Sequence, residues 1–119
     1  MARRVADLML EKKGVDVVLL DLRNLSSACD FFVICSGGSD VQVRAIAEHI
    51  EETLRAEGER PWHVEGRAQR KWVLVDYVHV VAHVFLPETR DYYLLERLWA
   101  DAPREELRDR LEPSGAPTP

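Results

Sequence analysis

Two stretches of the chain repeat apolar residues with the period of a helix. Residues 2–13 carry them on one face and are followed by Gly14, a residue type that commonly ends helices. Residues 40–57 carry a second apolar stripe, preceded by Ser39, a favourable N-cap, and followed by Gly58. Both stretches are therefore predicted to be amphipathic helices whose apolar faces pack on a core.

Five shorter stretches are rich in β-branched and aromatic residues, and each is predicted to be a strand. Three of them are apolar on both faces, a pattern typical of strands that are covered on both sides of a sheet. These three are residues 16–22, 31–35 and 78–86, and the other two are residues 60–65 and 72–77.

Prolines divide the last third of the chain. Pro87 is tolerated in the first turn of a helix, and residues 88–99 after it are predicted to be helical. Pro103 is predicted to start a last amphipathic helix that ends near residue 111. Residues 113–119 have nothing to bury, and we expect them to form a disordered tail.

The predicted elements follow the order α-β-β-α-β-β-β-α-α, without internal repeats. This order predicts an α/β fold class, with one domain over residues 1–112 in which a mixed β-sheet is flanked by helices. The chain has 119 residues, of which 46% are hydrophobic and 31% are charged. These values are typical of one globular domain.

The net charge of −5 argues against a general nucleic-acid binder, and we expect no sequence-specific nucleic-acid binding. Residues 1–71 hold 12 acids and 11 bases, whereas residues 72–119 hold 9 acids and 5 bases. The acidic C-terminal part favours a basic protein partner. The sequence has no transmembrane run and no signal-peptide core after its first arginines, so we expect a cytoplasmic protein without a membrane partner.

The cysteines and histidines do not form a metal-binding pattern. Cys29 and Cys35 are expected to be free thiols, because two cysteines cannot complete a zinc site, and Cys35 is interpreted as a small buried apolar residue. His79 and His83 share one face of a predicted strand, but about 13 Å separates them. We therefore expect no metal or cofactor, and we expect His83 to be a core or interface residue with a hydrogen-bond partner.

Gly37 to Asp40 joins a predicted strand to a predicted helix. A glycine loop at a helix N-terminus favours an anion, as in the Gly-Ser helix start of nucleotidyltransferases. Those enzymes also need two carboxylates on a following strand to hold magnesium, whereas Glu48, Glu51 and Glu52 lie on the predicted helix. We interpret the stretch as a turn with a helix cap and assign no catalytic residue. A nucleotidyltransferase-type enzyme remains an alternative.

Aromatic residues stand at both ends of the predicted strand 72–77. Trp72 and Asp76 share one face of this strand, and Tyr77 lies on the other. Trp and Tyr are frequent in binding hot spots, but they are equally suited to a core. The spacing leaves both interpretations open.

Several blocks of this sequence, in the same order, resemble the ribosomal silencing factor family, also called Iojap or RsfS. Together they cover about residues 3–103, and their combination makes the resemblance specific. The blocks are Asp21–Ser27 with Asp30–Ile34, Gly38–Ser39 with Val43–Ala47, His63–Gly66, Trp72–Tyr77, His83–Phe85 and Arg90–Ala102.

The resemblance implies a nucleotidyltransferase-like fold without the catalytic carboxylates, so we expect no enzyme activity. Family members bind ribosomal protein number fourteen of the large subunit, on the face that meets the small subunit. They block subunit joining and lower translation when nutrients are limiting. Relatives in organelles act in ribosome assembly, so a role as a large-subunit assembly factor is a second alternative for this chain. They are often homodimers when free. A homodimer of this chain that buried the same aromatic residues would compete with ribosome binding.

The resemblance places the contact surface on the last strands and the helix after them. Such a surface has an aromatic centre and an acidic rim, so its association with a basic ribosomal protein should slow as salt rises. The predicted contact residues are Trp72, Asp76 and Tyr77, with Glu65, Arg90, Tyr93 and Glu96 nearby.

One position departs from the family pattern. Relatives usually carry Gly-Asp after the tyrosine, whereas this chain carries Val78-His79. A β-branched valine resists the positive φ of a tight hairpin, so we expect a turn at Asp76–Tyr77 or another hairpin geometry. A protonated His79 at low pH would repel a basic partner.

Overall fold

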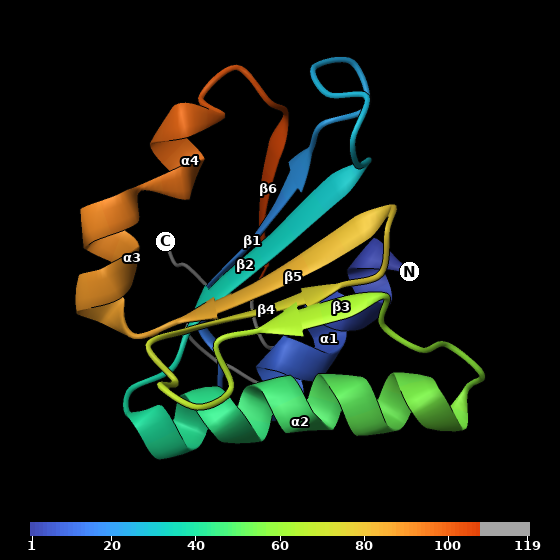
Figure 1. The fold of residues 1–119 in the computed structure, drawn as a ribbon. Coiled ribbons are helices and arrows are strands. Elements are labelled where there is room, and N and C mark those ends of the chain that lie inside the picture. The colour runs from blue at the N-terminus through green and yellow to red at the C-terminus, as the bar shows by residue number, and fades with distance from the viewer. Residues whose placement is uncertain (108–119) are drawn as a thin grey trace, which may run out of the picture.

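The computed structural model describes residues 1–107, and the side chains of Tyr92 and Tyr93 are outside that description. It contains a six-stranded sheet and four helices within this range (Figure 1). The elements are α1 (Ala2–Glu11), β1 (Val15–Asp21), β2 (Phe31–Ser36), α2 (Asp40–Ala56), β3 (His63–Glu65), β4 (Trp72–Asp76), β5 (Val80–Phe85), α3 (Pro87–Tyr93), α4 (Leu95–Leu98) and β6 (Arg104–Leu107).

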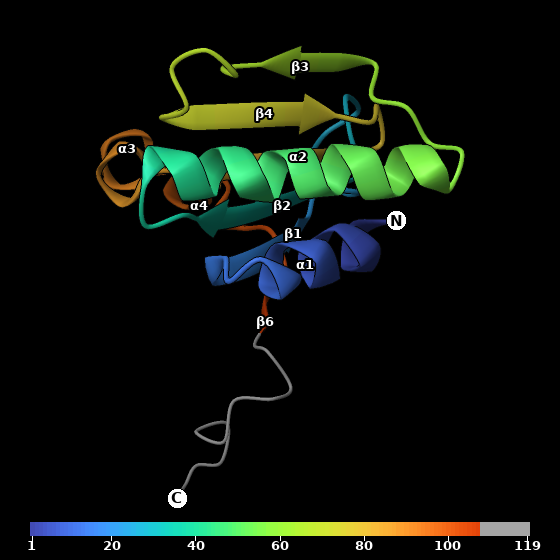
Figure 2. The ribbon, with the colours of Figure 1, turned by 90° about the horizontal axis from the view of Figure 1, so that it is seen from below.

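The sheet has the strand order β3-β4-β5-β2-β1-β6. The central pair, β2 and β5, is parallel, and every other neighbouring pair is antiparallel. Helices α1 and α2 lie side by side on one face, whereas α3 and α4 lie toward one end of the other face (Figures 1 and 2). The predicted α/β domain with a mixed, helix-flanked sheet is therefore confirmed. No helix within residues 1–107 is long and apolar enough to cross a membrane.

The two faces of the sheet each carry an apolar core. The first lies between the sheet and α1 with α2, and it includes Cys35, which is fully buried as predicted. The second lies on the opposite face and is built around Ile34 and Phe85, with Leu95 and Trp99 packed against it. Burial of one large apolar side chain contributes about 1.5–3 kcal/mol, so these two cores supply most of the folding free energy.

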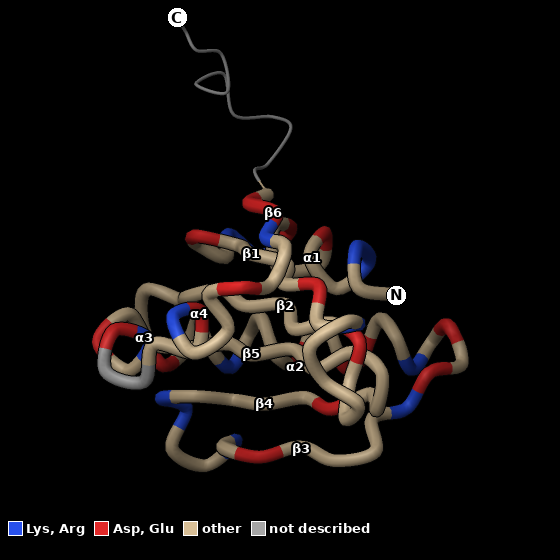
Figure 3. The backbone as a smooth tube through the Cα atoms, turned by 90° about the horizontal axis from the view of Figure 1, so that it is seen from above, with Lys and Arg blue, Asp and Glu red and all other residues tan. Residues whose placement is uncertain are grey.

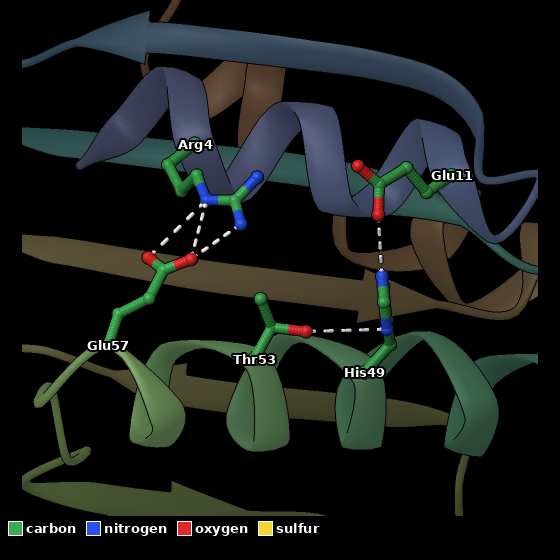
Figure 4. A network of polar contacts seen from close by, with 5 residues as sticks. All are labelled: Arg4, Glu11, His49, Thr53 and Glu57. Carbon is green, nitrogen blue, oxygen red and sulfur yellow. Dashed lines mark hydrogen bonds and ion pairs between the residues drawn. The ribbon is translucent and has the colours of Figure 1, made fainter.

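Polar side chains join α1 to α2 outside the first core (Figure 4). At one end, Arg4 Nε donates to Glu57 Oε2 at 3.1 Å. Toward the other end, His49 Nε2 lies 2.8 Å from Glu11 Oε1, and Thr53 Oγ1 lies 3.5 Å from His49 Nδ1. Both ends of α1 are thus connected to α2, and the two helices form one layer on this face of the sheet.

The prediction of a helix from Pro103 to residue 111 is wrong in its described part. Residues Arg104–Leu107 form strand β6, which pairs antiparallel with β1. The side chains of Glu105 and Leu107 are half-buried, while those of Arg104 and Glu106 are exposed, as strand alternation requires. Pairing with the unfilled edge of β1 outweighs the local helical pattern. Residues 108–111 and the expected tail over 113–119 lie outside the described residues.

The single helix predicted over 88–99 is divided into α3 and α4. Leu94 adopts a left-handed conformation, with φ 49° and ψ 51°, and its N–H donates to the carbonyl of Arg90. This break turns the chain so that Glu96 faces back toward Arg90. The two residues form an ion pair that stabilises the turn.

Candidate binding surface

The sheet face opposite α1 and α2 is lined by side chains of β3, β4 and β5, and we name it the β3–β5 face. Strand register sets these side chains next to one another, with Trp72 opposite Phe85 and Leu74 between His83 and Glu65. Figure 3 looks onto this face, where charged residues are absent along β5 and appear at the ends of β4. The residues of the face are His63, Glu65, Trp72, Leu74, Asp76, Val81, His83 and Phe85.

Trp72 is the half-buried aromatic residue of this face. Its ring stacks on Phe85 with centroids 4.8 Å apart and an interplanar angle of 26°. Its Nε1–H donates to His83 Nδ1 at 3.1 Å. Apolar support on one side and a hydrogen bond at the edge hold the indole in one orientation, as a rigid anchor requires.

His83 lies beneath Trp72, and its prediction as a core residue with a hydrogen-bond partner is confirmed. It is 3% exposed, and its ring meets Phe32 edge-on at 4.5 Å. Burial lowers the pKa of His83 to about 3, so the imidazole is neutral at physiological pH. His79, by contrast, lies in the turn before β5 and is exposed, 3.5 Å from Asp30.

Asp76 ends β4 and holds the turn into β5. Its Oδ1 accepts from the Val78 N–H at 2.7 Å. The Tyr77 carbonyl accepts from the His79 N–H at 3.0 Å, which makes Val78 the centre of a γ-turn with φ 76°. The turn is therefore centred on Val78 and not on Asp76–Tyr77. The valine adopts the positive φ it was expected to avoid, because the pairing of Asp76 with Val81 leaves only a tight connection.

Tyr77 lies on the opposite face of the sheet, in the first core. It is 7% exposed, and burial raises the pKa of its hydroxyl to about 12. Among the described residues the hydroxyl has no hydrogen-bond partner. The structure places Tyr77 in the first core, whereas Trp72 lies on the β3–β5 face and packs against the second core.

Arg90 and Glu96 form a buried clasp at the other end of the sheet. Arg90 is 8% exposed, and its Nε and Nη2 donate to the two carboxylate oxygens of Glu96 at 2.8 and 3.1 Å. Arg90 Nη1 also donates to Ser36 Oγ at 3.0 Å, and Arg104 pairs with Glu96 at 3.2 Å. These partners lower the pKa of Glu96. The clasp joins α3, α4 and β6 to the end of β2, so its contacts are structural.

Of the seven predicted contact residues, three share the β3–β5 face. Glu65, Trp72 and Asp76 lie there, with Glu65 at the exposed edge, 2.5 Å from His63. The side chain of Tyr93 lies outside the described residues. Strand alternation already placed Leu74 on the same side as Trp72. Sequence reasoning missed His83 and Phe85 as neighbours of Trp72, because only the register of β4 with β5 shows it.

The Gly37–Asp40 loop uses two of its N–H donors within the chain. Gly37 N–H donates to the carbonyl of Phe85 at 2.8 Å, and Gly38 N–H donates to Gln42 Oε1 at 2.7 Å. Ser39 Oγ accepts from the Gln42 N–H at 3.1 Å, so the predicted helix cap is confirmed. Within residues 1–107, no group of His, Cys, Asp and Glu is arranged to hold a metal ion.

The family model described as "Ribosomal silencing factor during starvation" (RsfS) matches residues 1–118. The chain belongs to the ribosomal silencing factor family. RsfS proteins of Halalkalibacterium halodurans and Bacillus subtilis are 44% and 43% identical to it over 97 residues, which are 82% of this chain and 83% and 82% of theirs. The RsfS-like fold also matches the crystal structure of a Chromobacterium violaceum protein, with a TM-score of 0.80, 33% identity and 94% coverage of both chains.

Proposed function

We propose that this RsfS-family chain is a ribosome-associated translation regulator that acts by binding. It binds ribosomal protein number fourteen of the large subunit and blocks association with the small subunit, which lowers translation under nutrient limitation. The observation that carries the proposal is the β3–β5 face, where Trp72 is held in one orientation and packs on apolar side chains. Family membership supports the ribosome as the partner.

The chemistry of the face suits a protein partner better than a small ligand. Its accessible centre is formed by Trp72 and Leu74 above buried Phe85, and aromatic side chains in apolar surroundings are the usual hot spots of protein interfaces. Nothing in this layer offers a charge to a nucleotide phosphate. The glycine loop at the start of α2 already uses two of its N–H donors within the chain, which favours binding over nucleotidyl transfer.

The charges around the face favour a basic protein. Glu65 and Asp76 flank the apolar centre, and the chain carries a net charge of −5. Complementary charge accelerates association mainly through long-range attraction, which salt screens over about 8–10 Å. The association rate should therefore fall with ionic strength, while the dissociation rate should depend on Trp72.

Purified protein mixed with separated subunits and sedimented through sucrose gradients tests this proposal. The wild type should travel with the large subunit and reduce the fraction of joined ribosomes, and Trp72→Ala should weaken binding about tenfold or more. Trp62→Ala is the matched control, because Trp62 is 75% exposed and does not belong to the β3–β5 face. It lies two positions before Val64, whose side chain packs on the first core on the other side of the sheet. This variant should behave as the wild type does.

A second variant separates charge from folding. Asp76→Asn keeps a side-chain oxygen for the Val78 N–H but removes the charge, so it should reduce the salt dependence of association without unfolding the hairpin. Sedimentation of the wild type with joined ribosomes, or with neither subunit, would contradict the proposal. Binding to the large subunit without any effect on joining would instead favour a role in subunit assembly.

A further inference from the structure

His83 occupies the centre of the second core directly under Trp72. Its strand register places it between Ile34 of β2 and Leu74 of β4. Its ring stacks nearly parallel to Phe85, at 14° and 6.1 Å, and meets Phe32 edge-on. An apolar side chain would fill this position at least as well, so the presence of an imidazole needs a reason other than packing.

The imidazole has one hydrogen-bond partner among the described residues. Its Nδ1 accepts from Trp72 Nε1, so the ring proton of the neutral tautomer resides on Nε2. Nε2 is buried and has no partner in the described part of the chain. A buried N–H without an acceptor is unfavourable. The unpaired Nε2 of His83 therefore lowers the stability of the fold, while its Nδ1 orients Trp72.

We propose that His83 is a positioning residue for partner binding, because its Nδ1 fixes the indole of Trp72 flat against Phe85. This inference rests on the proposed function of the β3–β5 face. The indole ring can rotate about its bonds to the backbone, and a stack of two rings does not by itself fix which edge faces the core. The hydrogen bond from Trp72 Nε1 to His83 Nδ1 directs the Nε1 edge toward the core, so the partner meets a preorganised side chain.

Two substitutions of similar size distinguish this role from simple packing. In His83→Asn, the side-chain oxygen is bonded to Cγ, as Nδ1 is in histidine, and can accept from Trp72 Nε1. In His83→Leu, a methyl group takes that place and cannot accept. Leucine is the better core residue, so the leucine variant should be at least as stable as the asparagine variant. Partner binding should follow the opposite order.

The experiment measures three quantities for the wild type and both variants: thermal stability, hydrogen exchange of the Trp72 indole N–H by NMR, and affinity for the large subunit. In His83→Leu, exchange should accelerate and affinity should fall about tenfold. In His83→Asn, both should stay within about threefold of the wild type. The indole N–H of exposed Trp62 is an internal reference for unprotected exchange.

Two outcomes would overturn the inference. Equal binding by His83→Leu and the wild type would exclude positioning, and losses of binding that follow stability in both variants would assign His83 to packing alone. Failure of the wild type itself to bind the large subunit is a different result, because it removes the proposed function on which the inference rests.

Discussion

Val78→Gly should stabilise the protein, because Val78 holds a conformation that suits glycine. A non-glycine residue in a sparsely populated positive-φ conformation costs about 1–3 kcal/mol, and β-branched residues are the least tolerant. Glycine removes this strain but adds about 0.5–1 kcal/mol of unfolded-chain entropy. Val78 is 49% exposed, so little apolar burial is lost. The expected net gain is about 1 kcal/mol.

Urea unfolding and thermal melts would measure this gain. For a chain of this length, 1 kcal/mol corresponds to a rise of about 3–6 °C in Tm. Val78→Ala removes most of the side chain but keeps a Cβ at positive φ, so it should be about 1 kcal/mol less stable than Val78→Gly. Val41→Gly is the matched control, since Val41 is 66% exposed at the start of α2 and its glycine variant should lose stability.

The reasoning would be refuted if Val78→Gly were less stable than Val78→Ala. That order is normal at positions with negative φ, and it would mean that no strain is stored at this turn. Val78→Gly should bind the large subunit as the wild type does, because residue 78 keeps the backbone N–H that donates to Asp76 Oδ1.

Three further predictions concern buried polar groups. Burial lowers the pKa of His83 from its ordinary 6.5 to about 3, so the histidine is protonated first in the unfolded chain and the free energy of unfolding should fall as the pH drops below 6.5. His83→Leu should remove this pH dependence, whose slope is up to about 1.4 kcal/mol per pH unit, and urea unfolding at pH 5–7 would measure it. Arg90→Ala should cost about 2–4 kcal/mol because it leaves Glu96 poorly paired, whereas Arg3→Ala at an exposed ion pair should change the unfolding free energy by less than about 1 kcal/mol. Burial raises the pKa of Glu51, so ionisation of this carboxyl opposes folding as the pH rises through that pKa. Glu51→Gln should therefore be at least as stable as the wild type at pH 7 and lose this advantage near pH 4. A Glu51→Gln variant that is less stable than the wild type at pH 7 would contradict the argument.

Local chemistry was sufficient to predict the long helix and its cap. Ser39, the apolar stripe of α2 and Gly58 are all signals carried by neighbouring residues, and the structure reproduces them within one residue. Strand β6 could not be predicted in this way. Its four residues become a strand because β1, more than eighty positions earlier, offers an unfilled edge.

The candidate surface was predictable only where strand alternation decided it. The alternation of 72–77 correctly separated Trp72 from Tyr77, but which of the two lies under α1 and α2 depended on where these helices packed. Arg90 and Glu96 looked like a charged rim because charged residues usually face water. Arg90 is buried and Glu96 is half-buried, because the break at Leu94 brings their opposite charges together.

The parallel pairing of β2 with β5 also has a consequence for biosynthesis. β5 inserts between β4 and β2, so the centre of the sheet cannot close until residue 85 has left the ribosomal exit tunnel. The β3–β5 face, including His83 and Phe85, is completed at that same moment. A growing chain whose residue 85 is still inside the tunnel therefore lacks the assembled β3–β5 face, on which the proposed binding to the large subunit depends.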